Sequence, residues 1–180
     1  EVIADIVEEE DDEEKYELLK MFSDAKQKHI LKEMSLDEVT DLLGELEDEE
    51  QEEVLAKLSH EDREDVRELL NYAEDSAGGL MTTEFISIRA KNTVRQTLEY
   101  LQKNTDAETT YYLYVTDRAN TLKGVVSLRD IVSSPFDTNM LEITNPNVIS
   151  VRYDEDQEQV AKMFEKYGFV MMPVVDEDHH

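Results

Sequence analysis

Apolar residues recur every twelve positions through the first half of the chain. Each repeat places apolar residues at positions i, i+1 and i+4, which lie on one side of a helix. Polar breaks separate the repeats, and two of them, Ser35 with Glu38 and Ser59 with Asp62, have the form of an N-cap followed by an acid in the first turn. The three apolar columns are Leu18, Ile30, Leu42, Val54 and Val66; Leu19, Leu31, Leu43 and Leu55; and Phe22, Met34, Leu46, Leu58 and Leu70.

This pattern predicts a stack of short helices over residues 16–71. A helix of about two turns is not stable alone, so neighbouring helices must bury the apolar stripe against one another. One long amphipathic helix is the competing interpretation, and the recurring caps and Gly44 argue against it. Residues 8–14 are a run of seven acids, so we expect residues 1–15 to form an acidic, frayed N-terminus.

Short β-branched runs alternate with helical patterns in the second half. The sequence Phe-Ile-Ser-Ile-Arg at residues 85–89 recurs as Val-Ile-Ser-Val-Arg at residues 148–152, an offset of 63. Each copy continues with a predicted helix and then a buried strand that ends in an acid, and the second copy stops before a further strand and helix. The expected elements are helices at 93–103 and 156–167, strands at 111–117, 122–126 and 171–176, and a helix that opens at Ser127–Asp130.

The two patterns meet at residues 72–82, where Gly78 and Gly79 stand together. Paired glycines let the backbone turn through angles that are closed to other residues, and Asp75 with Ser76 can begin a turn. We therefore expect a hinge between two domains at residues 72–82.

The charge of the chain is strongly negative and unevenly placed. The formal net charge is -27; residues 1–75 carry 29 acids against 8 bases, a net of -21, which leaves -6 for the remainder. Such a surface repels nucleic acid and anionic lipid and attracts hard cations such as Mg²⁺. The alternative is a solvated helical surface with no site. The chain has no cysteine, which excludes disulfides and thiolate metal sites, and no apolar run near the ~20 residues of a membrane span.

The repeated strand–helix–strand unit, closed in its first copy by Gly-Val-Val-Ser-Leu-Arg-Asp at residues 124–130, resembles the tandem CBS domain. The twelve-residue helical stack resembles the N-terminal domain of the MgtE-type magnesium transporters. The sequence Glu-Asp-Ser-Ala-Gly-Gly-Leu-Met-Thr at residues 74–82 resembles the signature that joins the two in this family. Residues 106–109, 127–130 and 156–158 fit the same family.

The resemblance implies an α + α/β two-domain fold, in which a superhelical N domain of short helices precedes a tandem CBS pair with an incomplete second copy. We expect the helical domain at residues 16–71 and the CBS pair at 83–180, its first motif at about 83–134 and its second at about 140–180. The implied protein is the cytoplasmic regulatory region of a magnesium transporter or channel. It is expected at the inner face of the membrane, dimeric through its CBS domains, with the transmembrane pore in the remainder of the chain.

In this family Mg²⁺ held between the helical domain and the CBS pair keeps the pore closed. The metal ligands that the resemblance implies are carboxylates and one backbone carbonyl. They are Asp37, Asp41, Asp156, Glu158 and the carbonyl of Gly79, with Glu165 as a substitute where Gly168 replaces an acid that the family often carries. Independently of the family, Asp37 and Asp41 are one helical turn apart and can face one hydrated ion. Asp156 is explained equally well as an N-cap.

An adenosine nucleotide, ATP or a relative of it, is the second ligand that CBS domains imply. Ser127 and Asp130 open a helix, where amides and a carboxylate can meet phosphate and ribose. Tyr112 and Phe169 could flank a base, with Arg129 near the phosphates. The alternative for all five residues is ordinary CBS core and cap.

Catalysis has little support in the sequence. His29 and His60 stand alone on polar helix surfaces, and neither a cysteine nucleophile nor a Gly-x-Ser-x-Gly or Walker-type loop is present. We therefore expect a sensor rather than an enzyme. The rival functions are a nucleotide-binding CBS module without metal sensing and an acidic scaffold that binds neither ligand.

Overall fold

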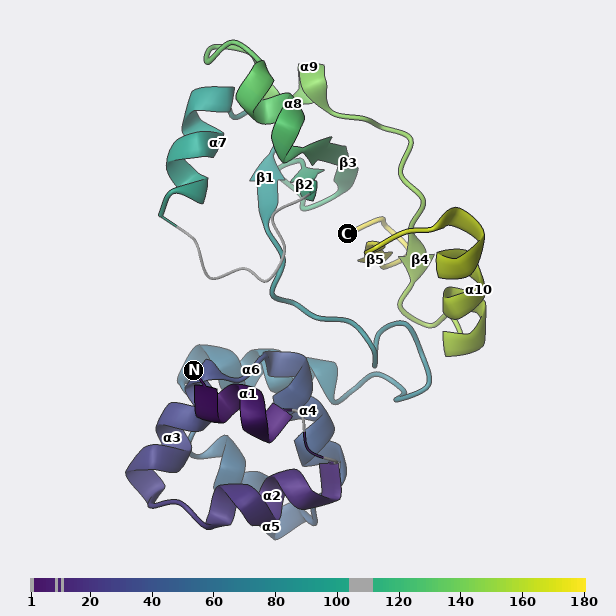
Figure 1. Ribbon diagram of the computed structural model, residues 1–180. Coiled ribbons are helices and arrows are strands. Elements are labelled where there is room, and N and C mark those ends of the chain that lie inside the picture. Colours follow the sequence, from purple (N-terminus) through teal and green to yellow (C-terminus); the bar gives the residue numbers. More distant parts are fainter. Residues whose placement is uncertain (1, 9, 11, 104–111) are drawn as a thin grey trace. The chain divides into compact units, whose positions relative to one another are not determined.

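The computed structural model describes residues 2–8, 10, 12–103 and 112–180 (Figure 1). The chain divides into two compact units, residues 1–83, here called the helical unit, and residues 84–180, here called the sheet unit. Residues 72–82, where a hinge is predicted, fall within the helical unit. In the described part of the chain no helix has the length and apolar character needed to cross a membrane.

The helical unit consists of short helices that follow the twelve-residue period. Helices α2 to α6 begin at residues 12, 24, 36, 48 and 60, which is the spacing of the apolar columns and not that of one long helix. α4 packs against α2 and α6, and α1 packs against α2 and α3. The helices are α1 (Val2–Glu8), α2 (Asp12–Lys20), α3 (Asp24–Glu33), α4 (Leu36–Gly44), α5 (Asp48–Leu55) and α6 (His60–Leu69).

The core of the helical unit is built from the predicted apolar columns. Leu42, Leu43, Val54 and Val66 are completely buried, and the partly buried Phe22 and Leu46 pack against them from the ends of helices. The predicted stack of short helices is therefore confirmed, because each helix buries its stripe against its neighbours.

A second column with the same period is polar. Gln51 follows Gln27 by twenty-four residues, with Val39 between them, and Arg63 follows Gln51 by twelve. Each of the three polar side chains donates to one or two backbone carbonyls at the end of the preceding helix or in the turn after it. Such donors satisfy carbonyls that lack partners within their own helix. The acceptors are Phe22 O for Gln27, Leu43 O and Leu46 O for Gln51, and Leu55 O and Leu58 O for Arg63, at 2.8 to 3.3 Å.

The N-terminal segment differs from the expected frayed tail. Val2–Glu8 forms α1, and Ala4 and Val7 lie in the core of the helical unit. Two apolar side chains on one face of a helix outweigh the effect of the acidic run that follows.

The two predicted N-caps differ in the structure. Ser59 accepts a hydrogen bond from the Asp62 amide, whereas Ser35 makes no side-chain cap although it occupies the N-cap position.

The first copy of the repeat in the sheet unit forms a three-stranded sheet of order β1-β2-β3. β1 pairs with β2 in parallel and β2 with β3 in antiparallel register. The core contains Ile88, Leu113, Val115 and Ile131, among others. The elements are β1 (Ser87–Arg89), α7 (Val94–Leu101), β2 (Tyr112–Thr116), β3 (Leu122–Ser127), α8 (Leu128–Ser133) and α9 (Met140–Ile143).

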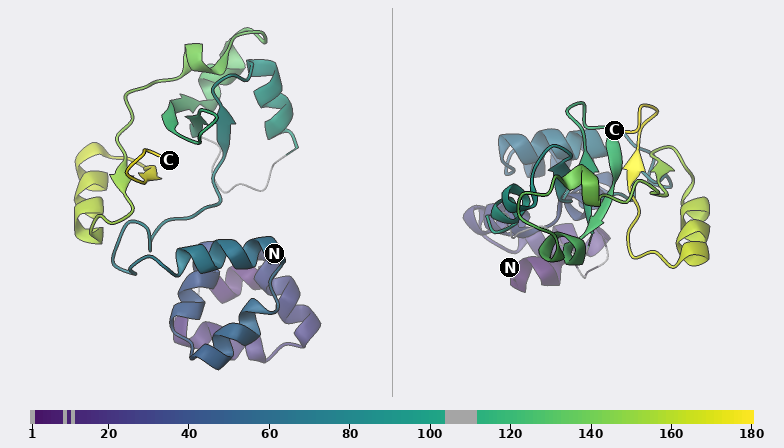
Figure 2. Two further views of the ribbon diagram at one scale, coloured as in Figure 1. Left: turned by 180° about the vertical axis from the view of Figure 1, so that it is seen from behind. Right: turned by 90° about the horizontal axis from the view of Figure 1, so that it is seen from above.

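The second copy is smaller. β4 (Val151–Arg152) pairs in parallel with β5 (Val174–Val175), and α10 (Gln157–Tyr167) runs beside this pair in both figures (Figures 1 and 2). No residue of α10 is buried. The described elements agree with the predicted fold class, since a helical unit precedes two repeats that combine helices and strands.

The acids that directly follow β2 and β5 shape the turns after these strands. Asp117 accepts hydrogen bonds from the amides of Ala119 and Thr121, at 2.8 and 3.1 Å, and Asp176 does the same for Asp178 and His180, at 2.9 and 2.8 Å. A hydrogen bond from Lys123 holds the pKa of Asp117 down at about 2. These acids are therefore turn residues in both copies.

Candidate functional site

Two of the predicted metal ligands lie on α4. Asp37 is half-buried in the first turn, and Asp41 is exposed one turn later. The Oδ1 atom of Asp37 is buried and has no hydrogen-bond partner among the described residues. A buried carboxylate oxygen without a donor is costly, and a cation is one group that would compensate it.

The chemistry of this face suits Mg²⁺, which takes oxygen ligands, retains several waters and needs one or two carboxylates. Nowhere in the described residues do three acidic or histidine side chains stand close enough to hold a metal. α4 could therefore supply two carboxylates to a hydrated ion, and binding there would be weak.

The predicted ligands on α10 are engaged in helix structure. Asp156 is the N-cap, and its Oδ1 accepts a hydrogen bond of 2.8 Å from the Glu158 amide. Glu158 lies 3.8 Å from the Lys162 ammonium. Glu165 is seven residues after Glu158, about 10 Å along the helix axis. Glu165 is therefore too far along α10 to share one ion with the two acids at its start.

Gly79 and Gly168, the two glycines considered with the predicted metal ligands, each stabilise a local backbone conformation. Gly79 ends a tight turn in which the Ser76 hydroxyl donates to Ala73 O at 2.6 Å and accepts from the Gly79 amide at 3.2 Å. Gly168 terminates α10 in the left-handed conformation, at φ 63°. Because this conformation favours glycine, helix termination explains the glycine where the family often carries an acid.

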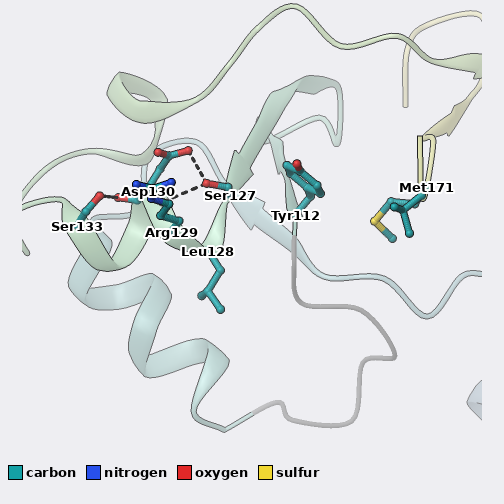
Figure 3. Close-up of a pocket in the computed structure, with 8 residues that line it drawn as sticks. Tyr112, Ser127, Leu128, Arg129, Asp130, Ser133 and Met171 are labelled. Atoms are coloured by element: carbon teal, nitrogen blue, oxygen red, sulfur yellow. Dashed lines mark hydrogen bonds between the residues drawn. The ribbon is translucent and has the colours of Figure 1, made fainter. Parts of the chain in front are cut away.

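A pocket of about 930 Å³ lies within the sheet unit (Figure 3). Four of the five predicted nucleotide-binding residues line it, namely Tyr112, Ser127, Arg129 and Asp130. In Figure 3, Ser127, Arg129 and Asp130 form one group, with Met171 on the other side of Tyr112. The structure thus brings a tyrosine ring, a guanidinium and a carboxylate to one cavity.

Hydrogen bonds fix the polar wall of this pocket. The Ser127 hydroxyl donates to Asp130 Oδ2 at 2.5 Å and accepts from the Asp130 amide at 3.1 Å. That amide was expected to meet phosphate; it is instead satisfied by the cap, because Ser127 is the N-cap of the six-residue α8. Arg129, which is exposed, is the positively charged residue among those that line the pocket.

Phe169 is not among the lining residues. Its ring stacks on Tyr167, with centroids 5.3 Å apart and planes 16° from parallel. Sequence reasoning missed Leu128, Ser133, Val170 and Met171, which also line the pocket. Val170, which directly follows Phe169, is one of these lining residues. Residues 106–109, which fitted the family in sequence, lie outside the described residues.

Two family models match the chain. The model of the MgtE intracellular N domain matches residues 1–75, and the CBS domain model matches residues 77–137 and 141–180. Among curated proteins, the magnesium transporter MgtE of Thermus thermophilus is 49% identical over 111 residues, or 61% of this chain, and that of Enterococcus faecalis is 48% identical over 115 residues, or 63% of this chain. The aligned residues make up 25% of each of these relatives, so the chain spans a part of their length.

Two solved structures resemble nearly the whole chain. One is described as the cytosolic domain of the Mg²⁺ channel MgtE in complex with ATP; it has a TM-score of 0.92 and 40% identity, over 98% of this chain and 73% of that one. The other, the soluble part of a magnesium transporter, has a TM-score of 0.90 and 40% identity, over 99% of this chain and 71% of that one.

Proposed function

Because the chain belongs to the MgtE family, as an MgtE N domain followed by CBS domains, we propose that it is the Mg²⁺-sensing cytosolic region of a magnesium transporter. Mg²⁺ bound by carboxylates of both units favours the closed state of the pore. The proposed ligands are Asp37 and Asp41 of the helical unit and Asp156 and Glu158 of the sheet unit. The main support from this chain is the buried Oδ1 of Asp37, which has no hydrogen-bond partner within the described part of the chain.

The physical basis of sensing is repulsion between like charges. Residues 1–75 carry a net charge of -21 and residues 76–180 a net of -6, so both parts of the chain are anionic. When bound, Mg²⁺ supplies positive charge that offsets this repulsion. Occupancy of a weak site changes with the Mg²⁺ concentration, and the populations of compact and extended conformations change with it.

The first experiment is small-angle scattering with and without millimolar Mg²⁺, at ionic strength matched with a monovalent salt to remove simple screening. The radius of gyration is expected to fall with Mg²⁺ and not with the monovalent salt. Equal compaction by the two salts would mean that the acids form a solvated surface, as in the scaffold alternative.

Asp37→Asn is expected to raise the Mg²⁺ concentration at the midpoint of this compaction about tenfold, which corresponds to the loss of about 1.4 kcal/mol of binding. The reason is that the substitution removes the charge of the proposed ligand while preserving its shape. Asp48→Asn, the same change in the exposed first turn of α5, is the control and should leave the midpoint near that of the wild type. Equal midpoints in the Asp37 variant and the wild type would remove Asp37 from the site.

We also infer that the pocket of the sheet unit binds an adenosine nucleotide, alongside metal sensing. The support is the group of Tyr112, Arg129 and Asp130 around one cavity and the ATP complex of the similar MgtE structure. The Tyr112 ring, half exposed at the start of β2, offers a face for stacking a base. Titration of Mg²⁺ alone and of ATP alone distinguishes metal sensing from nucleotide binding, because each function can then be measured without the other ligand.

Tyr112→Ala is expected to weaken ATP binding about tenfold in calorimetric titration, because stacking of a base on an aromatic ring contributes about 1 to 3 kcal/mol. Tyr100→Ala, which removes another exposed tyrosine of the sheet unit that does not line the pocket, is the control. An affinity that is equal in the wild type and both variants would place the base elsewhere.

Family membership supports a proposal for the remainder of the assembly. We propose that the longer protein contributes a transmembrane pore, that the CBS domains form a homodimer, and that this region lies at the cytoplasmic face of the membrane. In this arrangement the chain regulates ion flow and catalyses no reaction. Separation of the full-length protein by size, with light scattering, tests the dimer.

A further inference from the structure

We propose that Lys15 determines the metal selectivity of the α4 carboxylates by holding Glu38 in an ion pair, out of reach of the ion. This inference rests on the proposed function, since it concerns the same face of α4. It assigns a role to two residues that supply no ligand themselves.

Lys15 is a buried cation in a strongly acidic domain. Its residue is 4% exposed, and its Nζ lies 2.5 Å from Glu38 Oε2. The pair joins α2 to α4, which pack against each other. A buried lysine is rarely found without a paired anion, and Glu38 supplies that anion here. Glu38, with 32% of its side chain exposed, is thereby held toward α2.

The spacing on α4 shows what the pair prevents. Glu38 lies one residue after Asp37 and three before Asp41, and residues three or four apart on a helix are neighbours. Glu38 is therefore a neighbour of Asp41, whereas the consecutive residues Asp37 and Glu38 do not face each other. A Glu38 side chain released from Lys15 could turn toward Asp41 and add a third carboxylate to this part of α4. With the pair in place, no three acids in the described residues stand close enough to hold a metal.

The number of carboxylates separates Mg²⁺ from Ca²⁺. Mg²⁺ retains several waters and binds through one or two carboxylates, whereas Ca²⁺ takes six to eight oxygen ligands in flexible geometry. A third carboxylate would therefore raise the affinity for Ca²⁺ more than that for Mg²⁺. By pairing with Glu38, Lys15 limits the number of carboxylates that can bind the ion. The site therefore favours Mg²⁺, which retains several of its water ligands.

The test compares the dissociation constants of Mg²⁺ and Ca²⁺, each titrated alone by calorimetry, in the whole chain. Lys15→Met is expected to tighten Ca²⁺ binding about tenfold and Mg²⁺ binding about threefold or less, since the released charge attracts both ions and the added ligand favours Ca²⁺. Lys15→Met combined with Glu38→Gln, which removes the whole pair, should restore the wild-type ratio of the two constants. Lys15→Arg, which keeps the pair, should preserve that ratio.

Lys57→Met is the matched control. The Lys57 side chain is 6% exposed and pairs with Glu53 and Asp24, so this variant removes an equally buried lysine from the same domain. It should leave the ratio of the two constants unchanged. Where Lys15→Met does not fold, as judged by its helical circular dichroism, Lys15→Gln removes the charge but keeps a hydrogen-bond donor, and a smaller change in the same direction is expected.

The outcomes separate this inference from the proposed function. If Asp37→Asn weakens Mg²⁺ binding but a folded Lys15 variant leaves the ratio unchanged, the selectivity role is wrong and the site stands. If both ions tighten by the same factor, Lys15 acts through charge alone, and the selectivity role is again wrong. If Asp37→Asn changes neither constant, the site on α4 fails, and this inference fails with it.

Discussion

Gly124→Ala is expected to destabilise the sheet unit by roughly 3 to 5 kcal/mol, which is enough to unfold a marginally stable domain. A Cβ at this position would lie 2.3 Å from Asn145 O and 2.4 Å from Thr144 Cγ2. The φ angle of 154° is also one that favours glycine. Neither neighbour can move freely, because Val125 and Asn145 exchange two backbone hydrogen bonds, of 3.0 and 2.8 Å.

The measurement is hydrogen exchange of each unit in urea, which reports the sheet unit separately from the helical one. Gly168→Ala is the matched control, since a Cβ there would meet nothing within 4 Å although φ is 63°. It should cost about 1 kcal/mol, the strain of the left-handed conformation alone. If the two variants lost equal stability, the close approach to Asn145 would not be the cause.

Gly79→Ala is expected to destabilise the helical unit by about 2 to 4 kcal/mol. A Cβ at Gly79 would lie 2.3 Å from Ala73 O and 2.9 Å from Glu74 Cα, and both are backbone atoms of the same turn. The turn must therefore open, and the hydrogen bonds of the Ser76 hydroxyl must break. The expected readouts are a lower urea midpoint for the helical unit and faster exchange of the amides near Gly79.

Gly44→Ala is the control for this second variant. Gly44 ends α4, and a Cβ there would meet Glu74 Oε1 at 3.8 Å, an ordinary contact. Alanine favours helix over glycine, so this variant should be up to about 1 kcal/mol more stable than the wild type. A stable Gly79→Ala variant would show that the turn can relax, and Gly79 could then be tested as a metal ligand without a folding defect.

The magnitude of the Gly79 effect also bears on the proposed metal site. Loss of the Mg²⁺ response in Gly79→Ala would not distinguish a lost carbonyl ligand from an opened turn. Asp37→Asn has no such ambiguity, because the carboxylate is half-buried on a helix whose core residues are unchanged. For this reason the site is tested at Asp37.

The helical stack, the repeat of offset 63 and four of the eight residues that line the pocket of the sheet unit could be predicted from the sequence. Helix starts at residues 24, 36, 48 and 60 follow from apolar periodicity, a property that is local along the chain, whereas α2 begins at Asp12, within the segment that was expected to fray. The wall of the pocket formed by Ser127, Arg129 and Asp130 is also local, because the three residues lie within one turn of a helix start. Resemblance to CBS domains added Tyr112 from the neighbouring strand.

Pairings between distant segments become known only from the packing of the elements. No sequence period connects the segments that meet in these contacts. Examples are the ion pair of Lys15 with Glu38, the close approach of Gly124 to Asn145, and the position of Val170 in the same pocket as Ser127. The burial of α1 was decided in the same way, since an acidic neighbourhood predicts fraying until Ala4 and Val7 are seen in the core. Sequence patterns specify which face of an element is buried; what that face or side chain meets depends on how the elements pack.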